Sequence, residues 1–428
     1  MQSCQWLNNL TAVDQPPFDF ETIDFIGHPA FEKTPEQEKT SDDLTALLAR
    51  EFRSTCTMID EYIDRAARPG VLTSMRQRAT RLFTKSKKAP SFGDFCQSSE
   101  FTTLRKSLGR VQNAVSERLL ESESPVFSKQ FNRLELEIFR LLFYSSLKAS
   151  DLDLGIEPKL DTGQAQQAAN LKRNGIINAS LADTAKQRLK AVLAPYLESV
   201  QREPSDPREI GKYDRAVYFS AKEHGEIYQT LDELFLTEGI YALATSYTGL
   251  AMSLNSVVLH QARHGDEHIY QTFNDRKYTP KTINMHFDPK YGLIKLIIYI
   301  NKPGQNDGPF TYIPGSNNFE IDTLFKAAAK ANSVTNYLQT EDERSTFIKL
   351  PRQMRCNAIF GSMLTDASPE SPHVLASEIK LTAADYGDLF VFDPNGMHRG
   401  GICEPGGERF ALQVILRPTV RGKFVEGL

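Results

Sequence analysis

The first half of the chain places apolar residues at helical spacing. The stretch that opens at Ser41 begins with acidic residues and then repeats apolar positions every three to four residues, which predicts a helix over residues 41–66. The same pattern predicts further helices at about 99–122, 128–149 and 181–201. A charged, proline-rich stretch at 202–214 then predicts a linker or long loop.

The second half alternates short apolar runs with Gly, Pro and Asn turns. β-Branched and aromatic residues dominate these runs, so they are expected to be strands. The runs lie at 282–288, 292–301, 308–314, 387–393 and 409–418, and one predicted helix at 321–338 interrupts them. Many short strands with turns between them indicate a sandwich or barrel. We therefore expect an α+β protein with a mainly helical N-terminal region of unknown role at 1–205 and a β-rich domain at 206–428.

Composition and charge exclude several classes of protein. Of the 428 residues, 40% are hydrophobic and 24% are charged, which is typical of a chain with a packed core. A net charge of −4 argues against nucleic acid as a partner of the whole chain. No apolar run approaches the roughly 20 residues that span a bilayer, and the N-terminus lacks the pattern of a secretory signal. The five scattered cysteines form no disulfide or zinc pattern, so we expect a reducing cytoplasm.

One local charge run departs from this balance. Residues 65–88 contain eight basic side chains and no acidic one. Such a run is typical of a solvated helix face and loop, and it can also receive an acidic substrate or partner.

The segment richest in candidate metal-binding side chains is Asn284-Met285-His286-Phe287-Asp288. On a strand, residues two apart point to the same face, so His286 and Asp288 can direct an imidazole and a carboxylate at one point. His398 follows the predicted strand 387–393 in a glycine-rich turn and is the best third ligand. Two histidines and one carboxylate on one side of a metal are the facial arrangement of non-haem Fe(II) oxygenases.

Arg409 fits the co-substrate that such an oxygenase uses. 2-Oxoglutarate chelates iron at one end and leaves a carboxylate at the other, which a planar guanidinium can bind with two hydrogen bonds. Arg409 lies eleven residues after His398 and begins the predicted strand 409–418. Lys295 is a second candidate contact for 2-oxoglutarate, or a snorkelling lysine at a sheet edge. Asn284, two residues before His286, could hydrogen-bond cofactor or substrate.

From about Tyr213 to Pro418, roughly half the chain, the sequence resembles the phytanoyl-CoA dioxygenase-like family of Fe(II)/2-oxoglutarate oxygenases. The resemblance is carried by His286-Phe287-Asp288, the stretch Gly308 to Asn317, Gly387-Asp388-Leu389-Phe390, His398 and Arg409. Asn317 stands where a histidine often closes the corresponding turn of the family, a departure outside the expected ligands.

The resemblance implies a double-stranded β-helix, a jelly-roll or cupin-like fold. It implies iron bound by His286, Asp288 and His398, and 2-oxoglutarate held by Arg409. It also implies O2 as co-substrate and hydroxylation of a C–H bond, with succinate and CO2 released. A carboxylate at position 288 favours hydroxylation over halogenation, since related halogenases place Ala or Gly there.

A second histidine cluster competes for the metal. His260, His264 and His268 follow one another at intervals of four residues, so on one helix they would share a face and could bind zinc. Because Gly265 interrupts the helical pattern, a surface cluster or a substrate-pocket wall is the favoured interpretation.

Other interpretations stay open from the sequence. The chain could be a jelly-roll scaffold without catalysis, or a cupin-like metal enzyme that does not use 2-oxoglutarate. Two interpretations of Arg399 are equally open, a contact for a substrate anion and a charge at the rim of the site. Residues 367–377 are a candidate lid. Within the oxygenase reading, the substrate is a small molecule, and the basic run favours a phosphorylated or carboxylated one.

Overall fold

The structure is a computed structural model. It describes residues 35–67, 89–119, 125–149, 158–201, 216–264, 288, 290–317, 378–420 and 423–425. The predicted helix at 321–338, the predicted linker at 202–214 and the predicted lid at 367–377 lie outside the described residues, as does the predicted strand at 282–288 except for Asp288.

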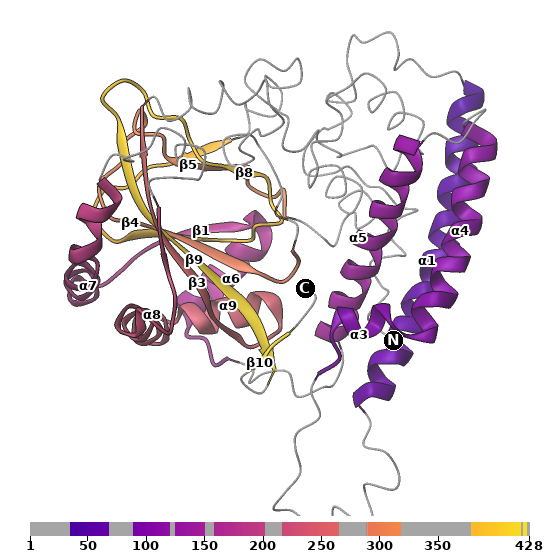
Figure 1. The fold of residues 1–428 in the computed structure, drawn as a ribbon, viewed down its shortest axis with the longest axis horizontal. Coiled ribbons are helices and arrows are strands. Elements are labelled where there is room, and N and C mark those ends of the chain that lie inside the picture. Colours follow the sequence, from indigo (N-terminus) through magenta and orange to yellow (C-terminus); the bar gives the residue numbers. More distant parts are fainter. Residues whose placement is uncertain are drawn as a thin grey trace, which may run out of the picture.

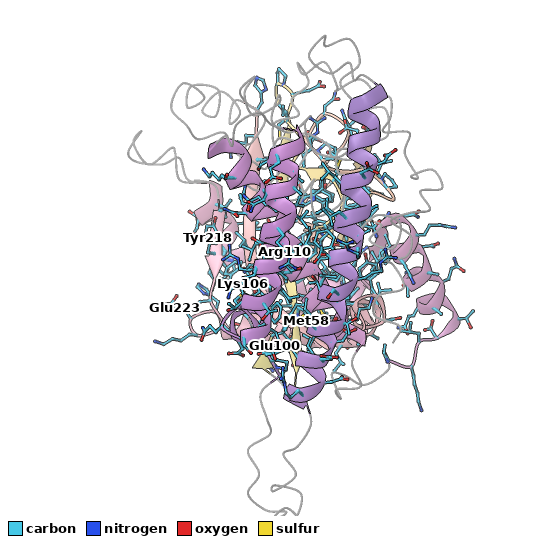
Figure 2. All side chains as sticks on the ribbon, turned by 90° about the vertical axis from the view of Figure 1, so that its right-hand side faces the viewer. Met58, Glu100, Lys106, Arg110, Tyr218 and Glu223 are labelled. Carbon is cyan, nitrogen blue, oxygen red and sulfur yellow. The ribbon has the colours of Figure 1, made fainter. Side chains whose placement is uncertain are left out.

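Four helices of the N-terminal part pack beside one another (Figure 1). They are α1 (Pro35–Ala67), α3 (Phe92–Cys96), α4 (Ser99–Leu119) and α5 (Pro125–Ala149). The helices predicted at 41–66, 99–122 and 128–149 are thus confirmed. Leucine and aromatic side chains repeat on their inner faces, and Phe95 lies in an aromatic cluster with Phe139 and Phe143. Figure 2 shows the opposite face, where the exposed Lys106 and Arg110 project from α4.

The second part contains two antiparallel sheets. The seven-stranded sheet has the order β1-β7-β4-β9-β3-β2, with β10 paired to β9, and the three-stranded sheet has the order β6-β5-β8. The large sheet comprises β1 (Ile176–Ser180), β2 (Ala216–Phe219), β3 (Met252–Arg263), β4 (Ile294–Tyr299), β7 (Asp388–Phe392), β9 (Glu408–Val420) and β10 (Lys423–Phe424). The small sheet comprises β5 (Phe310–Tyr312), β6 (Ile379–Leu381) and β8 (His398–Arg399). The strands predicted at 292–301, 308–314, 387–393 and 409–418 are confirmed.

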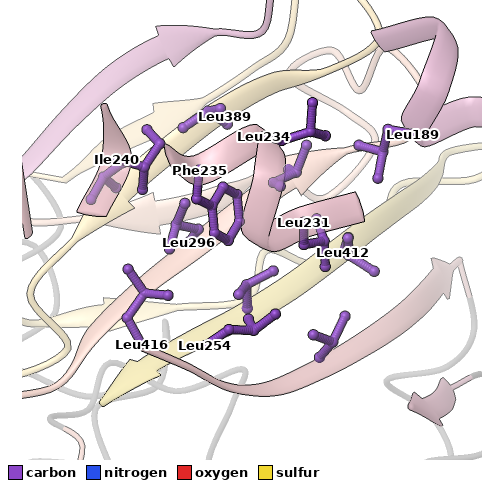
Figure 3. Close-up of a cluster of buried hydrophobic side chains, with 14 of the residues drawn as sticks. Leu189, Leu231, Leu234, Phe235, Ile240, Leu254, Leu296, Leu389, Leu412 and Leu416 are labelled. Atoms are coloured by element: carbon purple, nitrogen blue, oxygen red, sulfur yellow. The ribbon is translucent and has the colours of Figure 1, made fainter. Parts of the chain in front are cut away.

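Helices cover one face of the large sheet. These are α6 (Thr162–Asn174), α7 (Asp183–Gln201), α8 (Gly225–Thr237) and α9 (Ile240–Thr248). Alternate residues of β4 and β9, such as Leu296 and Leu412, point to this face and pack against Leu231 and Phe235 of α8 (Figure 3). This cluster is the largest apolar core of the described residues around the sheet, and it leaves the other face of each strand for the site.

The other face of the large sheet meets the small sheet. Ile297, Tyr299 and Phe392 of the large sheet pack with Phe310 and Tyr312 of the small one. We call the faces that enclose this cluster the inner faces. Helices combined with antiparallel sheets confirm the expected α+β class.

Several elements of the structure were not predicted from the sequence, among them β1, α6 and β3. Strand β1 and helix α6 lie before residue 205, yet β1 pairs with β7 and α6 packs against α9 and β1. The residues from 158 to 201 therefore join the sheet unit. Strand β3 was not predicted, because polar residues interrupt its apolar pattern, and its pairing with β2 and β9 stabilises it instead.

Helix α5 joins the helical part to the sheet unit. The hydroxyl of Tyr144 donates to the Thr248 carbonyl oxygen at 3.5 Å, and the Tyr144 ring lies against Gly292. Burial raises the pKa of the Tyr291 hydroxyl well above its usual value, and the nearby Glu137 carboxylate of α5 raises it further. The turn at Tyr291 and Gly292, just before β4, thus rests on α5.

Among the described residues, no helix combines the length and the apolar character needed to cross a membrane. Cys56 and Cys403 are buried, and the Cys403 thiol donates to the Asp307 carbonyl oxygen at 3.3 Å.

Gly292 is a position where substitution should destabilise the fold. Its φ is 73°, and a Cβ atom there would lie 2.5 Å from the Tyr144 ring. The change Gly292→Ala should lower the free energy of unfolding by about 2–4 kcal/mol, because it adds backbone strain and overpacking. Urea unfolding followed by circular dichroism measures this. Gly225→Ala, where nothing lies within 4 Å of the added atom, is the control and should unfold like the wild type. Equal stability of the two variants would contradict the packing of α5 on this turn.

Candidate active site

Asp288 and His398 come together from segments more than 100 residues apart. Asp288 precedes β4, and His398 opens β8. The Asp288 Oδ1 and His398 Nε2 atoms are 3.9 Å apart, and their side chains are 15% and 5% exposed. Two of the three predicted metal ligands therefore lie side by side. His286 and Asn284, the other predicted residues of this segment, lie outside the described residues.

The hydrogen bond of His398 fixes which nitrogen faces Asp288. Its Nδ1 atom lies 2.9 Å from the Gly396 carbonyl oxygen, and a carbonyl can only accept. Nδ1 therefore carries the proton, and in the neutral ring the lone pair is on Nε2, which lies near Asp288. The rings of Phe310, Phe392 and Tyr312 surround the imidazole and hold its orientation.

Lys295 contacts the same carboxylate. It lies on the inner face of β4, where it pairs with Phe392 of β7 and Ile415 of β9 in the strand register. Its Nζ atom forms an ion pair with Asp288 Oδ2. The side chains are 13% and 15% exposed, so the ammonium balances a largely buried negative charge. Lys295 thus lies beside Asp288 and is not a snorkelling lysine at a sheet edge, since β4 lies between β7 and β9.

Arg409 lies on the inner face of the neighbouring strand β9. One of its terminal nitrogens donates to the Gly308 carbonyl oxygen, close to β5. Burial raises the pKa of the Tyr299 hydroxyl, and the charge of Arg409 opposes this shift, which places the guanidinium near Tyr299. The charges of Arg409 and Lys295 also both lower the pKa of His260. The two cations therefore line one wall of the space between the sheets.

His260 lies on the same wall and was not among the predicted metal ligands. Its Nε2 atom lies 3.2 Å from Gln413 Oε1 on the adjacent strand. Burial lowers the pKa of His260 to about 4, and the charges of Arg409 and Lys295 lower it too, while the bond to Gln413 opposes the shift. His260 is therefore neutral near pH 7. The alternation of β9, which places residue 413 on the face of residue 409, could have indicated Gln413.

The competing histidine cluster does not form a shared helical face. Residues 252–263 are a strand, and His260 points to the inner face. His264 is exposed and its Nδ1 atom bonds the Cys403 carbonyl oxygen at 2.9 Å, while His268 lies outside the described residues. The helical spacing of these histidines therefore gives no common zinc site for the two that are described.

Two other predicted cations are engaged by acidic partners. Arg399 binds Glu378 through Nε at 3.2 Å and Nη2 at 3.0 Å, and both side chains are 10% exposed. This paired arginine anchors the residue before β6 and is not a rim charge. Arg65 is the described basic residue of the run 65–88 and contacts the Glu100 carboxylate. The other basic residues of the run lie outside the described residues.

The geometry of Asp288 and His398 fits a transition metal. Two ligand atoms about 2.1 Å from one metal, at right angles, lie about 3 Å apart, so the observed 3.9 Å needs little closure. Among the described residues no group of three metal-binding side chains occurs. A third protein ligand would have to come from residues outside the described ranges. His286, two positions before Asp288, is the predicted third ligand.

The neutral state of His260 predicts a specific pH dependence of stability. The unfolded chain binds a proton at this residue near pH 6.5, but the folded chain does so only near pH 4. The free energy of unfolding should therefore fall by ~3 kcal/mol as the pH drops from 6.5 to 4, and this contribution is absent above pH 6.5. Urea unfolding at several pH values should show a shallower loss for His260→Gln, while His264→Gln should follow the wild type. Identical slopes for the wild type and His260→Gln would contradict the burial of a neutral imidazole.

No known family has a profile that matches this chain, and no curated protein matches its sequence. In structure it is similar to AviO1 from Streptomyces viridochromogenes Tue57, with 14% identity over 62% of this chain and 100% of AviO1, at a TM-score of 0.34. It is also similar to EctD from S. alaskensis, solved with 2-oxoglutarate and 5-hydroxyectoine, with 12% identity over 62% and 80% of the two chains, at a TM-score of 0.38.

A third match, to EvdMO1, has 14% identity and a TM-score of 0.35, and this chain spans about half (49%) of its length. All three TM-scores lie below 0.5, so the functional assignment rests on the residues of this chain.

Proposed function

We propose that the chain is an Fe(II)- and 2-oxoglutarate-dependent dioxygenase with a double-stranded β-helix core. It would hydroxylate a C–H bond of a small-molecule substrate. The approach of Asp288 to His398 carries the proposal, because a carboxylate and an imidazole nitrogen converge where the ordered motif predicts a metal. The two facing sheets support the core fold, with the site between their inner faces.

His286, Asp288 and His398 would hold the metal. Bound Fe(II), together with 2-oxoglutarate and O2, supplies the oxidation of the substrate, with release of succinate and CO2. Asp288 would supply a carboxylate ligand to the metal, and a carboxylate at this position favours hydroxylation over halogenation. His398 contributes an oriented Nε2, because its Nδ1 proton is held by Gly396.

Arg409 and Lys295 would bind the acidic co-substrate. Arg409 presents a planar guanidinium on the inner face of β9, which suits the far carboxylate of 2-oxoglutarate. Lys295 balances the charge of Asp288 and lies on the adjacent strand, where its ammonium can also meet an anion at the metal. Asn284 stays a predicted contact of cofactor or substrate.

The rings around the site would exclude water from the reaction. Phe310, Phe392 and Tyr312 are each less than 7% exposed and enclose His398 on its ring faces and edge. A dry environment strengthens the charge interactions of Asp288 and Arg409 with their ligands. An anionic small molecule stays the favoured substrate class, and a reducing cytoplasm the expected setting.

We further propose that the catalytic unit begins before the predicted boundary. Strand β1 and helices α6 and α7 pack on the large sheet, so the unit includes residues from 158 onward. The helices up to residue 149 would then form the separate N-terminal region, with α5 as its contact to the unit.

The metal assignment is tested by removing its ligands. Asp288→Ala and His398→Ala should each abolish substrate-dependent succinate release and Fe(II) binding, because each removes one donor of the site. Anaerobic Fe(II) titration and succinate detection with a metabolite extract measure both. His264→Ala, an exposed histidine outside the site, should behave like the wild type. A wild-type chain without bound iron would indicate a scaffold, and full turnover by Asp288→Ala would refute the ligand assignment.

The role of Arg409 is tested through the co-substrate. Arg409→Ala should raise the 2-oxoglutarate concentration needed for half-maximal turnover by about ten- to a hundredfold, since a desolvated charge-assisted pair contributes about 1.5–3 kcal/mol. Arg263→Ala removes an arginine of the adjacent strand that pairs with Glu408, and it should leave this requirement unchanged. If iron binds but 2-oxoglutarate does not, the chain is a cupin-like metal enzyme of another kind.

A further inference from the structure

We propose that Asp393 is the positioning residue that holds both Asp288 and His398 in place. The inference rests on the proposed function and concerns a residue that lies outside the predicted ligand set. Asp393 follows β7 and is 1% exposed. A carboxylate so deeply buried needs specific partners, and Asn395 and Tyr247 donate hydrogen bonds to that of Asp393.

Both candidate ligands are attached to the turn that Asp393 begins, residues 393–396. The backbone N–H of Asp288 donates to the Pro394 carbonyl oxygen at 2.9 Å. The Nδ1 atom of His398 donates to the Gly396 carbonyl oxygen at 2.9 Å. A displacement of this one turn would therefore move the carboxylate and the imidazole together.

The Asp393 carboxylate determines the shape of this turn. Its Oδ1 atom accepts from both the backbone N–H and the side-chain amide of Asn395, each at 2.8 Å. Its own carbonyl oxygen accepts from the Gly396 N–H at 3.0 Å, which closes the turn. The other carboxylate oxygen, Oδ2, accepts from the Tyr247 hydroxyl at 2.6 Å and so ties the turn to helix α9.

Neighbouring contacts leave the turn little freedom to move. The Asp393 N–H donates to the Gly175 carbonyl oxygen at 2.8 Å, and the Tyr312 hydroxyl donates to the Asp393 carbonyl oxygen at 3.0 Å. A Cβ atom at Gly396 would overlap the Tyr312 hydroxyl, so no larger residue fits there. The Tyr312 ring also lies nearly parallel to the His398 ring, at 16°. The turn is therefore fixed from the end of α6, from β5 and from α9.

Substitution of Asp393 by Asn would disturb this arrangement at constant size. If the amide oxygen stays on Asn395, an NH2 group faces Tyr247, whose hydroxyl proton loses its acceptor. If the amide is reversed, its NH2 group faces the two donors of Asn395. In the first case the NH2 group can donate to the hydroxyl oxygen, but the hydroxyl proton is left without its acceptor. In the second case both hydrogen bonds to Asn395 are lost. Either change disturbs the turn to which the two ligands are attached.

The test compares Asp393→Asn with a matched carboxylate change on the same strand. Asp388, at the other end of β7, also shapes a turn, accepting from the N–H groups of Ala384 at 2.8 Å and Asp385 at 2.9 Å. Titration calorimetry with Co(II), a substitute for Fe(II), measures metal affinity, and circular dichroism measures folding and thermal stability. Asp393→Asn should bind Co(II) about 10- to 100-fold more weakly than the wild type, whereas Asp388→Asn should bind it equally well.

Each outcome decides a different point. A folded Asp393→Asn protein with wild-type Co(II) affinity would overturn the inference and leave the proposed function intact. A wild-type chain that binds neither Co(II) nor Fe(II) would overturn the proposed function and the inference with it. If Asp393→Asn does not fold, Tyr247→Phe decides, because it keeps the carboxylate and removes one of its hydrogen bonds. Weaker Co(II) binding by this variant supports the inference, and unchanged binding overturns it.

Discussion

A carboxylate buried between two sheets is the constraint on which the site depends. Asp288 is largely shielded from water, so its charge requires a cation, and its direction requires a fixed backbone. Lys295 supplies a cation from β4, and Pro394 holds the backbone from the turn after β7. The position of the site thus follows from the antiparallel order β7-β4-β9, which brings these strands next to one another.

The two faces of the large sheet have different roles: one packs the apolar core and the other carries the candidate site. The outer face carries leucine, isoleucine and valine side chains that pack against α6 to α9, and this cluster is larger than the apolar cluster on the inner face. The inner face carries charged and aromatic groups, among them Lys295, Arg409 and Tyr299. Because side chains alternate along each strand, one strand such as β9 can serve both purposes, with Leu412 on one side and Arg409 on the other. The packing of the outer face is what allows the inner face to be polar.

Much of this arrangement could be predicted from the sequence, and the exceptions have physical reasons. His398 and Arg409 were identifiable because their residue types and order indicate a chemistry, and the strands β4, β5, β7 and β9 because their runs are apolar. The contact of Lys295 with Asp288 was not predictable, because a turn separates the two residues and breaks the strand alternation. Asp393 reads in the sequence as an ordinary turn residue, since burial to 1% exposure arises only from contacts distant in the chain. Strand β1 was missed because it has five residues directly after a helix, and its pairing with β7 joins positions distant in the chain.

The pairing of β1 with β7 also limits how the chain can be divided. Strand β1 closes one side of the large sheet, and its five residues pair with β7 along that strand's whole length. A fragment starting at residue 206 would lose β1, α6 and α7 together, and the backbone groups of β7 would become an open template for strands of other molecules. Such a fragment would tend to self-associate through the exposed edge of β7, whereas a fragment starting at residue 158 would keep β1 paired with this edge.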